Sequence, residues 1–470
     1  MPIDLRRPLL VALAALLVAA AGVWLLAGAG GSARRTHVVA DRVPMDEVHP
    51  AGDGKKPGVV VAHGFAGSAK LMAQFGDTLA ARGYVVVLLD FTGHGANTRP
   101  MPPDDDAVLQ RDLEAAVGHL RSLPDVDPVR ISLVGHSMGA GAVTRYAAAH
   151  PDIAATVAIS LPQAPEAPPA HLLTLVGGLE FPAFQTAAKA GSRTVVVPGA
   201  DHVSILFSLR THRETADWLD GTAGGPLPSP VRRAGGAALL LVALAAGLVP
   251  MARLTLGPGA GGWPRFRWPL IGRAAAVTAV AATLAALAAR ILPTTRLPLA
   301  LGGYVLGLTS VTGALLLAYA IRRHRTPSEP QPRRPAAPLL IVYAAISIAV
   351  PLQLGLTQVV PVGPRWWLLP AVWAGFTLLA YAAERLAEGN SLAVLTVSAV
   401  TVIVLVAAAV LGLTSTFVLL VAPLLAALMV WQAVWSAVLH RFAAPRWVIA
   451  LAGSLLVAWP IATTLPLVSS

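Results

Sequence analysis

The second half of the chain repeats apolar segments that are each close to 20 residues long. An apolar run of this length with few charges is typical of a helix that crosses a bilayer. The composition agrees, because 55% of the residues are hydrophobic and only 13% are charged, against about 25% charged in ordinary soluble domains. We therefore predict an all-α membrane domain of about eight transmembrane helices over residues 223–470. The predicted spans are 234–251, 272–292, 298–321, 337–358, 366–384, 391–412, 416–439 and 447–467.

A further apolar run, Pro8 to Ala29, follows Arg6 and Arg7 near the N-terminus. It is longer than the apolar core of a secretory signal peptide, which is roughly 7–15 residues. Ala27-Gly28-Ala29 resembles a cleavage site, so a cleaved signal peptide is the alternative. We favour an uncleaved transmembrane anchor over residues 1–33, which makes nine spans in all.

Charge divides unevenly along the chain. Residues 1–220 hold 18 Lys+Arg against 21 Asp+Glu, whereas residues 221–470 hold 17 Arg, no Lys and 3 Glu. The basic residues of the second half lie between apolar spans, where they set membrane orientation, so no nucleic-acid partner is expected. The three glutamates are expected in or beside loops, which argues against a proton-coupled transporter.

Arginines also predict which side each loop occupies. With the N-terminus in the cytoplasm, fourteen arginines fall in inside loops and two in short outside loops, a strong positive-inside bias. Four arginines beside the large domain at 34, 35, 232 and 233 weaken it slightly. We expect a multi-pass protein of the cytoplasmic membrane with residues 34–222 outside. The inside set is Arg6, Arg7, Arg253, Arg265, Arg267, Arg273, Arg322, Arg323, Arg325, Arg333, Arg334, Arg385, Arg441 and Arg446, and the outside set is Arg296 and Arg365.

Residues 34–222 have an ordinary composition in which short β-branched runs alternate with helical segments. This alternation is typical of a doubly wound, mostly parallel α/β sheet. Helices are expected at 71–79, at 105–123 and from Ser137 to His150, where Pro151 disfavours continuation. The predicted strands are 58–62, 84–89, 129–134, 154–159, 172–176 and 194–197.

The strongest local signal is Gly135-His136-Ser137-Met138-Gly139, which follows a strand and precedes a helix. In this context Gly-x-Ser-x-Gly is typical of a nucleophile elbow, which exposes the serine Oγ on a strained turn. The backbone N–H of Met138 then lies at a helix N-terminus, where it can stabilise an oxyanion. Without that context the motif would be an ordinary Gly/Ser loop.

Two more motifs precede the elbow. Val61-Ala62-His63-Gly64-Phe65-Ala66-Gly67 is similar to the oxyanion loop of α/β-hydrolases, and Leu89-Asp90-Phe91-Thr92-Gly93-His94-Gly95 is similar to their next turn. Residues 58–221 thus resemble an α/β-hydrolase of the serine esterase and peptidase type. The resemblance implies Phe65 as the second backbone N–H donor. We expect His63, Asp90 and His94 to shape turns and not to perform chemistry.

The resemblance also implies an acid and then a histidine after Ser137. His202 follows the last predicted strand and is the candidate base, while His150, His171 and His212 are expected to be surface histidines. Glu180 follows the strand at 172–176 and is the candidate acid. The alternatives are Asp201, whose side chain should point away from that of its neighbour, and Glu166, which we expect in solvent.

No large cap is expected, because only about a dozen residues separate the strands ending near Ser160 and starting at Leu172. The absence of cysteine excludes a thiol nucleophile and Cys-ligated metal sites, and no cofactor or metal motif appears. The site should be open unless the membrane half covers it.

These features predict a membrane-anchored serine hydrolase that cleaves an ester by acyl-enzyme chemistry. Its expected partners are membrane lipid and a small-molecule or lipid-like ester, while peptidase and acyltransferase activity stay open. The alternative is a transport or scaffold protein whose hydrolase-like domain is a non-catalytic binding module.

Overall fold

Eight strands form one mixed sheet in the order β1-β2-β4-β3-β5-β6-β7-β8. The computed structural model describes residues 6–102, 107–221, 226–259, 266–323 and 335–469. Of these strands, β3 to β8 run parallel, and β1 and β2 form an antiparallel hairpin at one edge. The strands are β1 (Arg34–Ala40), β2 (Val43–His49), β3 (Lys56–Ala62), β4 (Val85–Leu89), β5 (Val126–His136), β6 (Ala155–Ile159), β7 (Leu172–Gly177) and β8 (Arg193–Val197).

Helices cover both faces of this sheet, which explains why its parallel strands are nearly continuous apolar runs. In β3, Val60 and Ala62 face α3 and α4, while Val59 and Val61 face α2. Each strand therefore buries both of its faces, as the doubly wound prediction requires. The helices are α2 (Ala73–Ala81), α3 (Ala107–Ser122), α4 (Met138–Ala149), α5 (Pro182–Ala187) and α6 (Leu209–Asp220).

The predicted α/β fold is confirmed, and the hairpin β1–β2 is the part that the prediction missed. Asp41 and Arg42 connect its strands with φ of 48° and 65°, the left-handed pair that a tight two-residue hairpin turn requires. Both strands carry charged residues, so they lack the β-branched runs by which the inner strands are recognised. No helix lies between β6 and β7, in agreement with the expected absence of a large cap.

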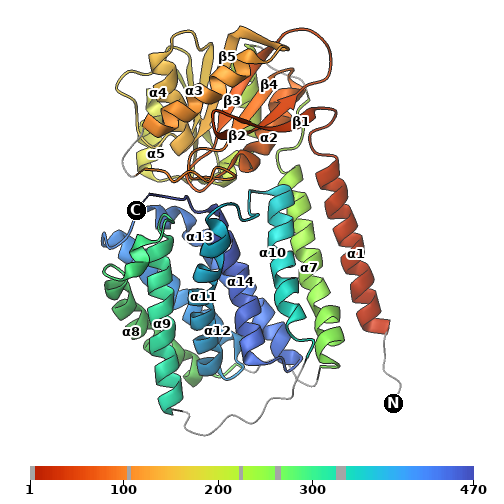
Figure 1. Ribbon diagram of the computed structural model, residues 1–470, viewed down its shortest axis with the longest axis vertical. Coiled ribbons are helices and arrows are strands. Elements are labelled where there is room, and N and C mark those ends of the chain that lie inside the picture. Colours follow the sequence, from red (N-terminus) through yellow and green to blue (C-terminus); the bar gives the residue numbers. More distant parts are fainter. Residues whose placement is uncertain (1–5, 103–106, 222–225, 260–265, 324–334, 470) are drawn as a thin grey trace.

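Long apolar helices form the second part of the molecule, and the sheet domain lies on one end of their bundle (Figure 1). Eight of the described helices are long and apolar enough to cross a membrane. These are α1 and seven helices that follow residue 231. The bundle contains α1 (Arg6–Ala27), α7 (Arg232–Leu256), α8 (Trp268–Ala288), α9 (Gly302–Arg323), α10 (Leu339–Gly355), α11 (Arg365–Ala387), α12 (Ser391–Val410), α13 (Phe417–Arg441) and α14 (Arg446–Thr464).

The helix α10 is shorter than its predicted span at 337–358. Its 17 residues measure about 26 Å at 1.5 Å per residue, slightly less than a hydrocarbon core of about 30 Å. It ends early because the side chain of Gln353 accepts hydrogen bonds from the N–H groups of Val359 and Val360, at 2.8 and 3.1 Å. The chain is thereby turned away from the helix axis.

The expected position of Glu384 in or beside a loop was wrong. It lies in the last turn of α11, which continues past its predicted end, and it is 2% exposed. Ser436 donates to one carboxylate oxygen at 2.6 Å, and Nε2 of His440 lies 2.5 Å from the other. Both partners belong to α13. Glu329 and the arginines at 265, 325, 333 and 334 lie outside the described residues.

The chain enters and leaves the sheet domain through α1 and α7, which pack side by side (Figure 1). A Cβ on Gly22 would lie 2.9 Å from the carbonyl oxygen of Gly236, so glycine permits this close approach. Arg233 in the first turn of α7 donates to Asp77 of α2 at 2.7 and 3.0 Å. The two parts are therefore connected by a partly buried ion pair as well as by the chain.

Candidate active site

Ser137 lies on a sharp turn between β5 and α4. Its φ of 52° and ψ of −117° are unusual for a residue with a side chain, and they turn the serine out of the strand. A Cβ on Gly135 would lie 2.3 Å from the carbonyl oxygen of Gly139, and one on Gly139 would lie 2.5 Å from that of His63. Both glycines of the motif are therefore needed for close backbone packing.

A line of hydrogen bonds connects three side chains from separate loops. Nε2 of His202 lies 3.0 Å from Oγ of Ser137, and Nδ1 of His202 lies 2.9 Å from a carboxylate oxygen of Glu180. Because β5, β7 and β8 are parallel, the loops after them meet at the edge of the sheet formed by the carboxyl ends of its strands. The structure thus brings together the three side chains that the sequence singled out.

Glu180 is held by two donors that the sequence reasoning did not identify. Its other oxygen accepts hydrogen bonds from Oγ of Ser160 at 2.7 Å and from N–H of Gly177 at 2.8 Å, and the carboxylate side chain is fully buried. Ser160 follows the β6 strand and has a φ of 54°. Only its position at a strand end, on the same edge as the elbow, could have suggested this contact.

Neither alternative acid takes part in this line of hydrogen bonds. Asp201 accepts hydrogen bonds from the backbone of Val203 and Ser204 and from the Ser204 hydroxyl, so it stabilises its own turn. These contacts lower the pKa of Asp201 despite partial burial, which by itself would raise it. Glu166 is exposed, as expected.

The expectation of a surface position was wrong for His212. This side chain is fully buried, stacks on Phe75 with ring centroids 4.1 Å apart, and bonds the hydroxyl of Thr78 at 2.6 Å. Burial lowers its pKa to about 4. The helix α6 is polar overall, but it packs His212 against α2. The polar sequence of α6 does not show that this residue is buried. His171 is exposed, and His150 is half-buried.

The loop after β3 carries the second expected N–H donor. Among the described residues, neither the N–H of Phe65 nor that of Met138 has a hydrogen-bond acceptor. A Cβ on Gly64 would lie 3.1 Å from Cβ of Ser137, so this loop passes directly beside the serine. Both N–H groups are thus free to bind a ligand oxygen at this edge.

Buried polar side chains shape this loop and the next turn. His63 accepts from the N–H of Phe91 at 3.1 Å and donates to the carbonyl of Gly64 at 2.7 Å. The carboxylate of Asp90 accepts from the N–H groups of Ala69 and Ala96, at 2.7 and 2.8 Å. Burial lowers the pKa of His63 to about 4 and raises that of Asp90 to about 6.

The helical bundle covers this side of the site. The ring of Phe65 packs against the ring of Phe417, at the start of α13, with centroids 4.5 Å apart. Oγ of Ser68 lies 2.9 Å from the hydroxyl of Thr357, in the connection after α10. Ser137 itself is half-buried. The bundle therefore contacts the loop that carries the proposed oxyanion donor.

Arg365 was expected in an outside loop, and it is completely buried between the two parts. Its Nη2 donates to the carbonyl oxygens of Gly93 and Leu465, at 2.9 and 3.2 Å. The N–H of Leu467 also donates to Gly93, and the N–H of Met101 donates to Leu467, both at 2.8 Å. The C-terminal segment and α11 thus hold the turn that follows β4.

Two aromatic rings lie beside that of His202, and the polar one, His136, is 4.9 Å away between centroids. The ring of Phe184 lies 4.7 Å from that of His202, measured between centroids. Leu179 and Phe181, on either side of Glu180, are 70% and 48% exposed. Among the described residues, no group of three or more His, Cys, Asp or Glu side chains could hold a metal ion.

Residues 54–195 match the family model described as serine aminopeptidase, S33. The matched range contains the loop of Phe65, the elbow and Glu180, and it ends seven residues before His202. A hypothetical protein of Pseudomonas aeruginosa superposes on 40% of this chain and 93% of its own, with 15% identity and a TM-score of 0.34.

Curated relatives are similar over the same part of the chain. An uncharacterized protein of Mycobacterium tuberculosis is 36% identical over 106 residues, 23% of this chain and 36% of that protein. A cutinase of Thermobifida alba is 29% identical over 108 residues, 22% and 34% of the two chains. The quorum-quenching protein AidA of Acinetobacter baumannii is 30% identical over 110 residues, 23% and 36% of the two. The chain spans about a third of the length of these relatives.

Proposed function

Because residues 34–197 form an α/β-hydrolase domain, we propose that this protein is a membrane-anchored serine hydrolase that cleaves carboxylic esters. The observation that carries the proposal is the line of hydrogen bonds from Ser137 through His202 to Glu180. Nucleophile, base and acid then follow in the chain order of this fold. The similarity to a cutinase supports an ester substrate.

The proposed reaction begins with attack of Ser137 Oγ on the ester carbonyl carbon. Nε2 of His202 takes the hydroxyl proton as the new C–O bond forms. The carbonyl oxygen becomes an oxyanion, which the N–H groups of Phe65 and Met138 stabilise. Each such donor typically contributes a factor of about 10² to 10³ in kcat.

Collapse of this intermediate breaks the bond to the alcohol, which takes the proton from His202 and leaves an acyl-Ser137 ester. Water then attacks the acyl carbon, His202 takes a proton from it, and the carboxylic acid is released as Oγ regains its proton. The carboxylate of Glu180 accepts the Nδ1–H of His202 throughout. This contact fixes the tautomer in which Nε2 is the base, and it stabilises the imidazolium as it forms.

An ester with an apolar acyl group suits the surroundings of the proposed triad. The ring of Phe184 packs against that of His202, and Leu179 and Phe181, the chain neighbours of Glu180, have exposed apolar side chains. The bundle brings long apolar helices to the same edge of the sheet (Figure 1). Because a lipid-like ester would be concentrated in a bilayer at that level, we favour it over a freely soluble ester.

The proposed domains are an anchor at residues 1–33, the hydrolase at 34–222 and a membrane domain at 223–470. We place the hydrolase outside the cytoplasm. Its support is that Arg322, Arg323, Arg385 and Arg441 lie at the ends of α9, α11 and α13, while the other ends of these helices lie toward the sheet domain (Figure 1).

A fluorophosphonate probe tests the nucleophile in the full-length protein. We expect labelling of the wild type and of Ser122→Ala, an exposed control serine, and loss of labelling in Ser137→Ala. Hydrolysis of p-nitrophenyl butyrate should fall with it, while a matched p-nitroanilide reports amidase activity. Labelling that persists in Ser137→Ala, or equal hydrolysis by both variants, would disprove the assignment and favour a non-catalytic binding module.

A further inference from the structure

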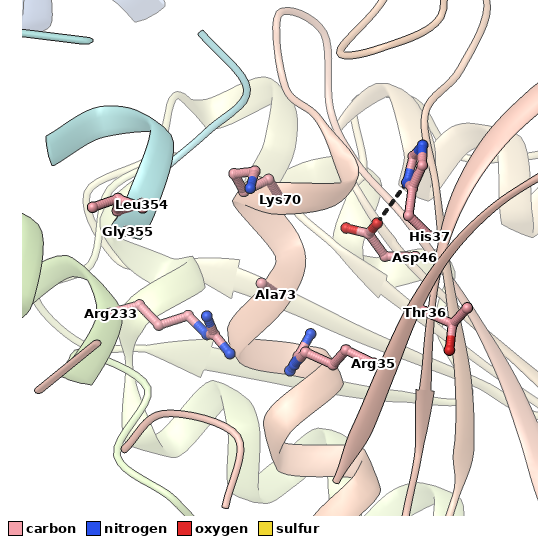
Figure 2. Close-up of a pocket in the computed structure, with 9 residues that line it drawn as sticks. All are labelled: Arg35, Thr36, His37, Asp46, Lys70, Ala73, Arg233, Leu354 and Gly355. Atoms are coloured by element: carbon pink, nitrogen blue, oxygen red, sulfur yellow. Dashed lines mark hydrogen bonds and ion pairs between the residues drawn. The ribbon is translucent and has the colours of Figure 1, made fainter. Parts of the chain in front are cut away.

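A cavity of about 230 Å³, the volume of roughly eight water molecules, lies between the hydrolase domain and the bundle. It is separate from the proposed active site, because β1, β2 and the start of α2 line it on one side. The first turn of α7 and the last turn of α10 line it on the other. Figure 2 shows its lining residues.

Three cationic side chains surround this cavity. Arg35 and Arg233 extend toward each other from opposite sides, and Lys70 lies above them (Figure 2). Asp77 binds both arginines, through Oδ1 to Arg35 and through both oxygens to the fork of Arg233. A single carboxylate therefore faces two guanidinium groups.

Lys70 has no hydrogen-bond or ion-pair partner among the described residues. On the far wall, Nδ1 of His37 lies 2.9 Å from the carboxylate of Asp46, so the three cationic side chains are opposed by two carboxylates, Asp77 and Asp46. Burial, and the nearby charge of Arg233, lower the pKa of Arg35, although Asp77 and Asp46 oppose this. An added anion would relieve this excess of positive charge.

The cavity lies at the end of an apolar surface. Leu354 lines it, and an exposed stripe of apolar side chains runs from there along α10 at a spacing of three or four residues. Each side chain of the stripe is between 40% and 56% exposed: Leu339, Val342, Ile346, Val350 and Leu354. A cationic cavity above an apolar stripe matches a molecule with an anionic head and an apolar tail.

We propose that this cavity binds the phosphate group of an anionic phospholipid, with an acyl chain along the apolar stripe of α10. The free charge of Lys70 and the paired guanidinium groups of Arg35 and Arg233 recognise the phosphate. The inference rests on the proposed placement of α7 and α10 in a bilayer, and it does not depend on catalysis by Ser137. The bound lipid would connect α7 and α10 to β1 and α2.

Lipid retention by the full-length protein tests this proposal. The protein is reconstituted in mixed vesicles of phosphatidylglycerol and phosphatidylcholine, extracted in mild detergent and measured by native mass spectrometry. We expect phosphatidylglycerol to be enriched on the wild type and on Lys70→Arg, which keeps the charge. Lys70→Ala should lower this enrichment on the order of fivefold, the usual effect of one basic residue near a membrane surface.

Lys55→Ala is the matched control, because Lys55 is an exposed lysine just before β3 and is not among the residues that line the cavity. It should retain lipid like the wild type. Equal retention by Lys70→Ala and Lys55→Ala would overturn the proposal, as would equal enrichment of the two phospholipids. Fluorophosphonate labelling of Ser137 is a separate readout, so failure of this proposal is distinguishable from failure of the proposed hydrolase.

A second arm distinguishes a lipid from free phosphate. The wild type is incubated with inorganic phosphate or with glycerol phosphate, which has the head but no tail. We expect neither at millimolar concentration to displace phosphatidylglycerol, because both lack the contact with α10. Displacement by either compound, or binding of phosphate without lipid enrichment, would contradict the lipid assignment.

Discussion

The acid in the proposed triad is a glutamate, whose side chain is one methylene longer than that of aspartate. The extra length is taken up by contacts behind the carboxylate, where Ser160 and the N–H of Gly177 hold one oxygen. The other oxygen then reaches His202 at 2.9 Å. The position of the carboxylate therefore depends on Ser160 as well as on Glu180.

Substitution of the acid separates the two candidates. We expect Glu180→Gln to lower kcat at least about 10²-fold, because the His202 tautomer and imidazolium lose their support. Asp201→Asn should cost less than about tenfold, and Glu180→Asp should keep partial activity. The measurement is kcat and KM on a short-chain p-nitrophenyl ester with full-length protein. A larger loss in Asp201→Asn would mean that the acid is misassigned.

Buried histidines predict how the stability of the hydrolase domain depends on pH. Burial lowers the pKa of His63 and His212 to about 4 and that of His136 to about 3, against an ordinary value of 6.5. The unfolded chain binds more protons below pH 6.5, so stability is lost as pH falls from 6.5 toward 4. Asp90, whose pKa burial raises to about 6, acts in the opposite direction, and the three histidines outweigh it.

Thermal unfolding between pH 7 and 4.5 measures this effect. We expect the apparent Tm of the wild type to fall steadily as the pH is lowered, and His212→Gln to reduce the slope. His171→Gln, at an exposed position, should leave the slope unchanged. The slope is compared rather than the absolute Tm, because the His212 substitution also removes packing on Phe75. An apparent Tm independent of pH would contradict the neutral buried histidines.

At the scale of elements, α11 contributes a buried arginine to the turn that follows β4. Arg365 donates to carbonyl oxygens of residues 272 and 100 positions away in the chain. The held turn carries His94, whose ring packs against that of Phe65 with centroids 5.7 Å apart. Arg365 can therefore position the loop with the proposed oxyanion donor without touching substrate.

Removal of this arginine should weaken catalysis more than substrate binding. Arg365→Ala leaves a buried carbonyl without its charged donor, which costs about 1–3 kcal/mol. We expect a lower apparent Tm and a kcat reduced about tenfold with little change in KM, since the oxyanion forms only during reaction. Arg296→Ala, at an exposed site, is the control. Equal kinetics for both variants would rule out a positioning role.

At the scale of the whole molecule, the bundle packs against the edge of the sheet that holds Ser137, and not against the opposite edge (Figure 1). With the helices in a bilayer as proposed, the proposed active site would lie at the level of the membrane surface. This placement would connect the two halves functionally, because an ester that partitions into the bilayer would reach the site without crossing bulk water.

Single cysteines test the proposed orientation, since the natural chain has none. Ser122→Cys is exposed on α3 of the hydrolase domain, and Ser328→Cys lies between α9 and α10 in the chain. We expect an impermeant maleimide to label Ser122→Cys in intact cells and Ser328→Cys only after lysis. The reverse pattern would place the hydrolase domain in the cytoplasm.

Features that depend on local pattern could be predicted from the amino-acid sequence. Apolar runs of bilayer length predicted the helical half, and the strand–turn–helix context of Ser137 predicted the elbow, because periodicity and glycine spacing act over a few residues. Contacts that join distant segments could not be predicted and are visible only in the folded molecule: the hydrogen bond from Ser160 to Glu180, the burial of His212 and Arg365, and the packing of Phe417 on Phe65. Such contacts depend on how elements pack in space. The local sequence around a polar side chain at a helix end is the same whether that side chain faces water or a buried carbonyl.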